Sequence, residues 1–181
     1  MLLDAAKTSL LVIDVQERLL PAMAAPEQVV AKTTILLKAA RELGLTITLS
    51  EQYPRGLGHT VPELAGNDAT VFEKLSFSCW RDAAIKDHFI KMHEGGRPLV
   101  IVAGIEAHVC VLQSCIDLAN AGFGVYAVAD ATSSRSASSA GLAFDRMRNV
   151  GVQVVNTEMV VFELLERAGT PQFKSLSAVI K

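Results

Sequence analysis

Short apolar segments of strand length alternate with longer amphipathic segments of helix length along most of the chain. This alternation constrains the fold strongly, because strands separated by helices pair in parallel and need helices on both faces of their sheet. Residues 9–14 are an example, in which a run of apolar residues is followed at once by a carboxylate. The sequence therefore predicts an α/β fold with a doubly wound, mainly parallel sheet of six strands, Rossmann-like in class.

The expected elements follow one another as strand and helix, with one exception. Strands are expected at residues 9–14, 45–49, 70–72, 98–103, 125–129 and 152–155. Helices are expected at residues 26–43, 83–92, 108–121, 137–149 and 159–168, and a glycine closes several of them. Residues 50–67 show neither the helical nor the strand periodicity of apolar residues. They are rich in Gly, Pro and polar residues, which is typical of a functional or disordered loop.

Composition narrows the classes of function that fit this chain. Its 181 residues are 50% apolar, which fits one ordered domain over residues 1–181 rather than a disordered chain. The net charge is −2, from 17 basic and 19 acidic residues, and the basic residues are scattered, so we expect no nucleic-acid partner. The longest stretch without a charged residue, 118–129, is shorter than the roughly 20 residues of a membrane span, so we expect no membrane partner either.

The cysteines and the N-terminal segment indicate a compartment. Three cysteines are an odd number in a chain large enough to fold without disulfides, which favours a reducing environment. The first apolar run ends at Asp14 and is too short for the core of a signal peptide. We therefore expect a cytoplasmic protein.

Reactive side chains follow three of the expected strands. Asp14 follows the first, Lys74 the third, and Cys110 comes after the fourth, in the opening turn of an expected helix. Because the carboxyl ends of parallel strands meet at one edge, we expect a carboxylate, an ammonium and a thiol to converge there. The helix N-terminus and Lys74 are expected to make the thiolate the main form of Cys110. Taken singly, each residue also has a structural interpretation: a helix cap for Asp14, a solvated lysine for Lys74 and a packing residue for Cys110.

Other patterns indicate neither a cofactor nor a metal. Residues 122–127 match the dinucleotide pattern G-x-G-x-x-A but precede a strand, so no helix N-terminus follows to receive phosphates. The four histidines form no H-E-x-x-H motif and the cysteines no C-x-x-C motif, so no zinc site is expected. We interpret Cys79 and Cys115 as packing residues.

Four spaced motifs carry a resemblance to a known family. They are Ile13-Asp-Val-Gln16, Phe72-Glu-Lys74, Gly104-Ile-Glu-Ala-His-Val-Cys110 and Asp130-Ala-Thr-Ser-Ser134. Through them the chain resembles the isochorismatase-like cysteine hydrolases, which include nicotinamidases, N-carbamoylsarcosine amidases and isochorismatases. Residues 51–54 and 56–64 make it most similar to the small isochorismatase-domain proteins of unassigned substrate.

The resemblance implies a site and an assembly. The family's catalytic triad falls on Asp14, Lys74 and Cys110. A cis peptide bond that family members carry before the nucleophile would fall between Ile105 and Glu106. The backbone N–H groups of Glu106 and Cys110 are the implied donors of an oxyanion hole. A homo-oligomer, a dimer or larger, is also implied.

Two positions depart from the family's pattern. Nicotinamidases bind a metal through Asp-x-His-x-x-His in the region of residues 51–60, where this chain has only His59, so no metal is expected. Many relatives have Thr where this chain has Ala107, and one hydroxyl of the nucleophile loop is therefore missing.

These observations lead to one hypothesis and two alternatives. The hypothesis is a hydrolase that cleaves the C–N bond of a small amide or carbamoyl substrate through a thioester on Cys110. Gln16, Gln52, Phe77 and Trp80 are the candidates for substrate contacts. The alternatives are isochorismatase-type hydrolysis of a vinyl ether, and a binding or regulatory domain of the same fold without turnover.

Overall fold

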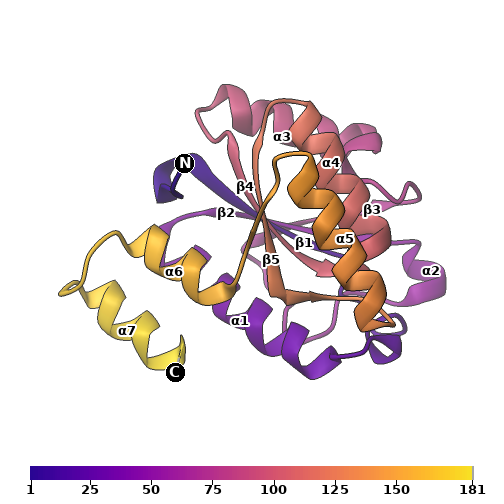
Figure 1. The fold of residues 1–181 in the computed structure, drawn as a ribbon, viewed down its shortest axis with the longest axis horizontal. Helices are drawn as coiled ribbons and strands as arrows, with labels where there is room; N and C mark the ends of the chain where they lie inside the picture. The colour runs from indigo at the N-terminus through magenta and orange to yellow at the C-terminus, as the bar shows by residue number, and fades with distance from the viewer. Residues whose placement is uncertain (181) are drawn as a thin grey trace.

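A computed structural model describes residues 1–180 and contains one six-stranded parallel sheet (Figure 1). The strand order is β3-β2-β1-β4-β5-β6, so the predicted doubly wound α/β fold is confirmed. The strands are β1 (Thr8–Ile13), β2 (Thr46–Gln52), β3 (Ala69–Lys74), β4 (Leu99–Ile105), β5 (Gly124–Ser133) and β6 (Gln153–Val155).

Seven α-helices and four short helical turns accompany the strands among the described residues. The helices are α1 (Pro26–Leu43), α2 (Pro54–Leu57), α3 (Ala83–Glu94), α4 (Leu112–Asn120), α5 (Ala137–Asn149), α6 (Thr157–Leu165) and α7 (Pro171–Ile180). The short turns are η1 (Ala5–Lys7), η2 (Leu20–Ala22), η3 (Cys79–Arg81) and η4 (Ala107–Val111), of which η4 is π-helical. None of the described helices is both long and apolar enough to cross a membrane.

Two layers of helices cover the sheet. Strand β1 is buried on both faces, and alternate side chains enter different cores. Leu10 lies in the core with helices α1 and α6, and Leu11 in the core with α3, α4 and α5. In Figure 1 these two groups of helices lie on opposite sides of the sheet, and α7 packs outside α1 and α6.

The structure differs from the sequence expectations in three segments. Strand β2 continues to Gln52 and α2 follows, so the expected loop at residues 50–67 is shorter than its composition indicates. The expected helix at residues 108–121 starts as the π-helical turn η4 and becomes regular only at α4. Helix α7 was not expected, and it is held by tertiary packing around buried Leu176.

The topology creates one crevice at the carboxyl edge of the sheet. The chain leaves β1 toward β2 on one side, while β4 lies on its other side, and ligands bind at such a switch point in open α/β sheets. Gly104, near the end of β4, has φ +121°, and a Cβ there would lie 2.1 Å from the Ile13 carbonyl oxygen. Only glycine therefore lets the ends of β1 and β4 approach so closely.

Candidate active site

Asp14 is buried at the centre of this edge, directly after β1. Its backbone is in the left-handed region, with φ +53°, and its N–H donates to the Ser50 carbonyl at 3.0 Å. The hydroxyl of Ser50 donates to Asp14 Oδ1 at 2.7 Å, and Lys74 Nζ donates to Oδ2 at 2.7 Å. Both carboxylate oxygens are therefore held in place, and Asp14 is not a helix cap.

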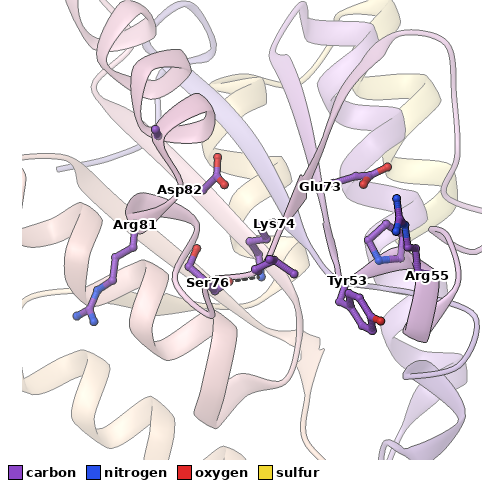
Figure 2. Close-up of a pocket in the computed structure, with 10 residues that line it drawn as sticks. Tyr53, Arg55, Glu73, Lys74, Ser76, Arg81 and Asp82 are labelled. Atoms are coloured by element: carbon purple, nitrogen blue, oxygen red, sulfur yellow. Dashed lines mark hydrogen bonds between the residues drawn. The ribbon is translucent and has the colours of Figure 1, made fainter.

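Lys74 ends β3 and points into the protein. Its side chain is 0% exposed, which excludes the interpretation as a solvated lysine. Besides Asp14, Nζ contacts Gln52 Oε1 at 2.7 Å and the carbonyl oxygens of Ser76 and Phe77, each at 3.2 Å. Figure 2 shows the contact of the Lys74 ammonium with Ser76. Such a set of acceptors fixes the ammonium beside Asp14.

Cys110 lies in η4 and is buried. Hydrogen bonding from its thiol is one of the influences that lower the pKa of Asp14. The structure thus brings together the three residues expected from the strand ends, with the ammonium and the thiol both next to the carboxylate. Cys115 is fully buried in α4, while Cys79 Sγ lies 3.6 Å from Ser50 Oγ, adjacent to the group.

Burial dominates the electrostatics of the three groups. Burial raises the pKa of Asp14, although Lys74 opposes the shift. Burial lowers the pKa of Lys74, but the negative charges of its neighbours, Asp14 first, outweigh burial and leave the pKa above its usual value. Burial and the Asp14 charge raise the pKa of the Cys110 thiol, against Lys74. The expectation that the thiolate is the main form of Cys110 is therefore wrong, because the thiol is buried next to a carboxylate.

The loop before Cys110 presents backbone groups to the same region. The Ile105–Glu106 peptide bond is cis. The Glu106 carbonyl accepts hydrogen bonds from the N–H groups of Val109 and Val111, at 3.1 and 3.2 Å. Within residues 1–180, the Glu106 N–H has no hydrogen-bond acceptor. This N–H is free to bind an acceptor on a ligand.

The two expected glutamine contacts are parts of the scaffold. Gln16 Nε2 donates to the carbonyls of Gln52 and Gly58, at 3.0 and 2.7 Å, and Gln16 Oε1 accepts from the Gln52 N–H at 2.7 Å. Because both side-chain N–H groups of buried Gln16 bind protein carbonyls, Gln16 braces the loop, and its contact with a substrate stays a prediction. Gln52 uses its side chain to hold Lys74 and the Leu75 carbonyl, so it positions the ammonium.

The two expected aromatic contacts are in different places. Phe77 is 54% exposed, and its carbonyl accepts a hydrogen bond from Lys74, so it lies at the site. Trp80 packs edge-on against Phe123, with Lys86 Nζ 5.5 Å from its ring centre. Trp80 lines a separate depression near Phe123, so the structure does not bring it to Asp14 and Cys110.

A depression of about 550 Å³ opens beside Lys74 (Figure 2). Its lining carries three cationic groups, those of Arg55, Lys74 and Arg81, and two carboxylates, those of Glu73 and Asp82. Tyr53 adds an aromatic wall. Because Lys74 is paired with Asp14, the other opposite charges are equal in number, which favours a ligand without a large net charge.

Several residues of this region were not identified from sequence. Tyr53 and Arg55 belong to the segment expected to be a functional loop, so its composition was the available signal. Ser50 was missed because it lies inside β2, which extends beyond the expected strand. It pairs in register with Ile13, the residue before Asp14, and only the strand pairing reveals this.

The region of His59 contains a hydrogen-bonded carboxylate. Glu51 Oε1 accepts from the N–H and hydroxyl of Thr60, at 2.7 and 2.8 Å, and Oε2 lies 2.9 Å from His59 Nδ1. Across residues 1–180, no three or more His, Cys, Asp or Glu side chains are grouped to hold a metal ion. Glu51 therefore ties this loop together through its own protein partners.

Comparison with known proteins agrees with the resemblance that the sequence motifs indicate. The family model of the isochorismatase domain matches residues 8–159. The secreted isochorismatase effector Isc1 of Phytophthora sojae (strain P6497) is 36% identical over 177 residues, which are 95% of this chain and 83% of that protein. Isochorismatase domain-containing protein 1 of Salmo salar is 38% identical over 97% of this chain, and the match spans only 62% of that longer protein.

Solved structures give the same architecture. The structure of MAR1 ribonuclease from Caenorhabditis elegans has a TM-score of 0.91 and 34% identity, and covers 99% of this chain and 92% of that one. The YcaC gene product of Escherichia coli, described as an octameric hydrolase of unknown specificity, has a TM-score of 0.89. It is 24% identical over 99% of this chain and 90% of its own, a likeness that shows a shared fold.

Proposed function

The chain belongs to the isochorismatase family, and from that premise we propose that it is a cysteine hydrolase. Its substrate would be a small amide or carbamoyl compound, and the C–N bond would be cleaved through a thioester on Cys110. One observation carries the proposal: the Asp14 carboxylate is fixed by Lys74 and Ser50, each at 2.7 Å, with the Cys110 thiol beside it. A fixed carboxylate next to a protonated thiol fits a general base and its nucleophile.

The proposed first step forms the thioester. Asp14 takes the thiol proton while Cys110 Sγ bonds to the carbonyl carbon, and the oxygen becomes an oxyanion. The backbone N–H groups of Glu106 and Cys110 receive that charge, a contribution of roughly 3–4 kcal/mol per donor in comparable sites. The C–N bond then breaks, and Asp14 returns its proton to the leaving nitrogen.

The proposed second step releases the acid. Asp14, again a carboxylate, takes a proton from water as the water oxygen bonds to the thioester carbon. The C–S bond breaks, and the proton returns to Cys110 Sγ. Lys74 keeps its charge throughout and holds Asp14 in position, which its four acceptors support.

The surroundings favour this reaction over its alternatives. Vinyl-ether hydrolysis needs an acid more than a nucleophile and leaves Cys110 without a role. The resemblance to MAR1 ribonuclease raises RNA as a substrate, yet a polyanion is attracted by an excess of positive charge, while this chain has net charge −2. The balanced charges beside Lys74 fit a small substrate of low net charge better.

A substrate screen tests the proposed reaction. We expect wild-type protein to release ammonia or an amine from at least one small amide, urea or carbamoyl compound, with loss of this release in Cys110→Ala. The matched control is Cys115→Ala, because Cys115 is another buried thiol and lies in α4, outside the group. Undiminished release by Cys110→Ala would contradict covalent catalysis, and vinyl-ether products without any amine would favour the first alternative.

The proposal extends to the state of the protein in the cell. All three cysteines are free in the structure, which supports a reducing compartment and so a cytoplasmic location. The related Isc1 is named as secreted, whereas we propose a cytoplasmic location for this chain. We also propose a homo-oligomer, which the octameric YcaC neighbour supports by analogy of fold.

A further inference from the structure

We infer that Glu106 and Arg135 form a positioning pair for the oxyanion site, in which Arg135 acts through Glu106 on the loop that carries Cys110. The inference rests on the proposed function and adds to it a residue outside the triad. Arg135 lies between β5 and α5, whereas Glu106 lies between β4 and η4, so the pair joins two loops at the same sheet edge.

Arg135 donates three hydrogen bonds to the Glu106 carboxylate, although Arg135 itself lies at the surface. Arg135 Nη2 donates to Glu106 Oε1 at 2.7 Å, and Arg135 Nε donates to Oε2 at 3.0 Å. The Arg135 backbone N–H also donates to Oε2, at 3.1 Å. The Glu106 side chain is only 6% exposed, while that of Arg135 is 67% exposed. A bidentate contact of this kind, here called a fork, fixes the orientation of the carboxylate and compensates its negative charge.

The main chain of Glu106 connects this pair to the nucleophile. Its carbonyl accepts the Val109 and Val111 N–H groups and so anchors η4, which contains Cys110. Its N–H is the proposed oxyanion donor. Movement of the Glu106 side chain would therefore move both the donor and the turn that presents the thiol.

A second contact joins the same two loops. His108 Nδ1 lies 2.9 Å from Ser134 Oγ, one residue before Arg135. The loops are thus linked at a second point besides the Glu106–Arg135 pair, which limits their relative movement. This arrangement restricts the Glu106 N–H to one direction, as preorganised stabilisation of a transition state requires.

The pair also removes an electrostatic conflict. The hydrogen bond from Arg135 lowers the pKa of Glu106, against the effect of burial, and His108 contributes in the same direction. Glu106 is therefore a carboxylate, and an unpaired negative charge in this residue would oppose an oxyanion forming at its own N–H. The Arg135 guanidinium neutralises that charge.

Two reactions of Cys110 separate the oxyanion site from the reactivity of the thiol. With p-nitrophenyl acetate, Sγ bonds to the carbonyl carbon, the thiol proton goes to Asp14, and nitrophenolate leaves with the C–O electron pair after an oxyanion has formed. With iodoacetamide, Sγ displaces iodide from carbon, the thiol proton goes to Asp14, and no oxyanion forms. The ratio of acylation rate to alkylation rate of Cys110 therefore isolates the oxyanion contribution.

We expect Arg135→Ala to lower this ratio at least about tenfold, because small displacements of positioning groups are costly in catalysis. The control is Arg41→Ala, since Arg41 binds Asp68 through a similar fork, at 2.6 and 3.1 Å, between α1 and the segment before β3. The control should leave the ratio unchanged. In a Glu106→Gln background, Arg135→Ala should add little, as expected for residues that act as one unit.

Each outcome bears on a defined claim. A wild-type ratio in Arg135→Ala, or a full additional loss in the Glu106→Gln background, would overturn the positioning pair while leaving the Cys110 nucleophile intact. Acylation that persists in Cys110→Ala would instead overturn the proposed function, and the positioning pair with it. Thermal unfolding of each variant shows whether the fold is retained, so that rates are compared between folded proteins.

Discussion

Replacing Lys74 with methionine is expected to lower the free energy of unfolding by about 3–5 kcal/mol, because it leaves the buried Asp14 carboxylate without its counter-charge. The Lys74 side chain is fully buried against Asp14, so solvent cannot screen the remaining charge. Urea unfolding at neutral pH measures the loss.

The pH dependence of this variant has a defined sign. Without Lys74, the pKa of folded Asp14 rises further above its value in the unfolded chain. The contribution of Asp14 to stability is then greatest at low pH, where Asp14 is protonated in both states, and is lost as the pH rises through the folded pKa. The difference between variant and wild type should therefore shrink in acid.

The matched control for Lys74→Met is Lys38→Met. Lys38 Nζ lies 2.7 Å from Glu42 Oε1, the same separation as in the buried pair, but both side chains are partly exposed. Solvent-screened pairs of this kind contribute less than about 1 kcal/mol. Equal losses in the two variants would contradict the structural role assigned to Lys74. The double variant Asp14→Asn, Lys74→Met removes both charges and should recover part of the stability.

Changing Asp14 to asparagine is expected to slow acylation of Cys110 by p-nitrophenyl acetate by about 10²- to 10⁴-fold, the usual contribution of a general base. The Asn side chain keeps the size of Asp14 but takes no proton from the thiol. The deficit should decrease at high pH, where Cys110 ionises without help, because its raised pKa places that ionisation above the usual range. Stopped-flow release of nitrophenolate measures the rate.

The pH profile of wild-type acylation tests the same assignment. Burial raises the pKa of Asp14, so the acid limb should lie above the range of an ordinary aspartate and should be absent in Asp14→Asn. Ser50→Ala removes a hydrogen bond that lowers this pKa, so its acid limb should move to higher pH. An unchanged limb in Asp14→Asn would show that another group takes the proton.

The order of strands and helices made much of this site predictable. Apolar runs that end in Asp14, Lys74 and the Cys110 loop were enough to place three side chains at one edge, because parallel strands share the direction of their carboxyl ends. The protonation state of Cys110 was not predictable in the same way. It depends on burial and on a facing carboxylate, both of which arise from packing between distant segments.

The other contacts that the sequence did not predict have related causes. Both side-chain N–H groups of Gln16 bind carbonyls of Gln52, at the end of β2, and of Gly58, which the sequence showed only as parts of a polar loop. Trp80 is close in sequence to Phe77, but it lies in η3 and packs against Phe123. The position of a residue after a strand does not determine this direction. The Glu106–Arg135 fork joins residues that are 29 positions apart. Such contacts follow from the three-dimensional arrangement of loops rather than from local patterns.

The central claim, that Cys110 is an acyl-forming nucleophile, is tested most directly by mass spectrometry of the protein quenched in acid during reaction with p-nitrophenyl acetate. We expect one added acetyl group on the peptide that contains Cys110, removable by hydroxylamine as a thioester is, and its absence in Cys110→Ala. Nitrophenolate release by folded wild-type protein with the acetyl group on another residue, or with no acylated protein at any time, would contradict the account.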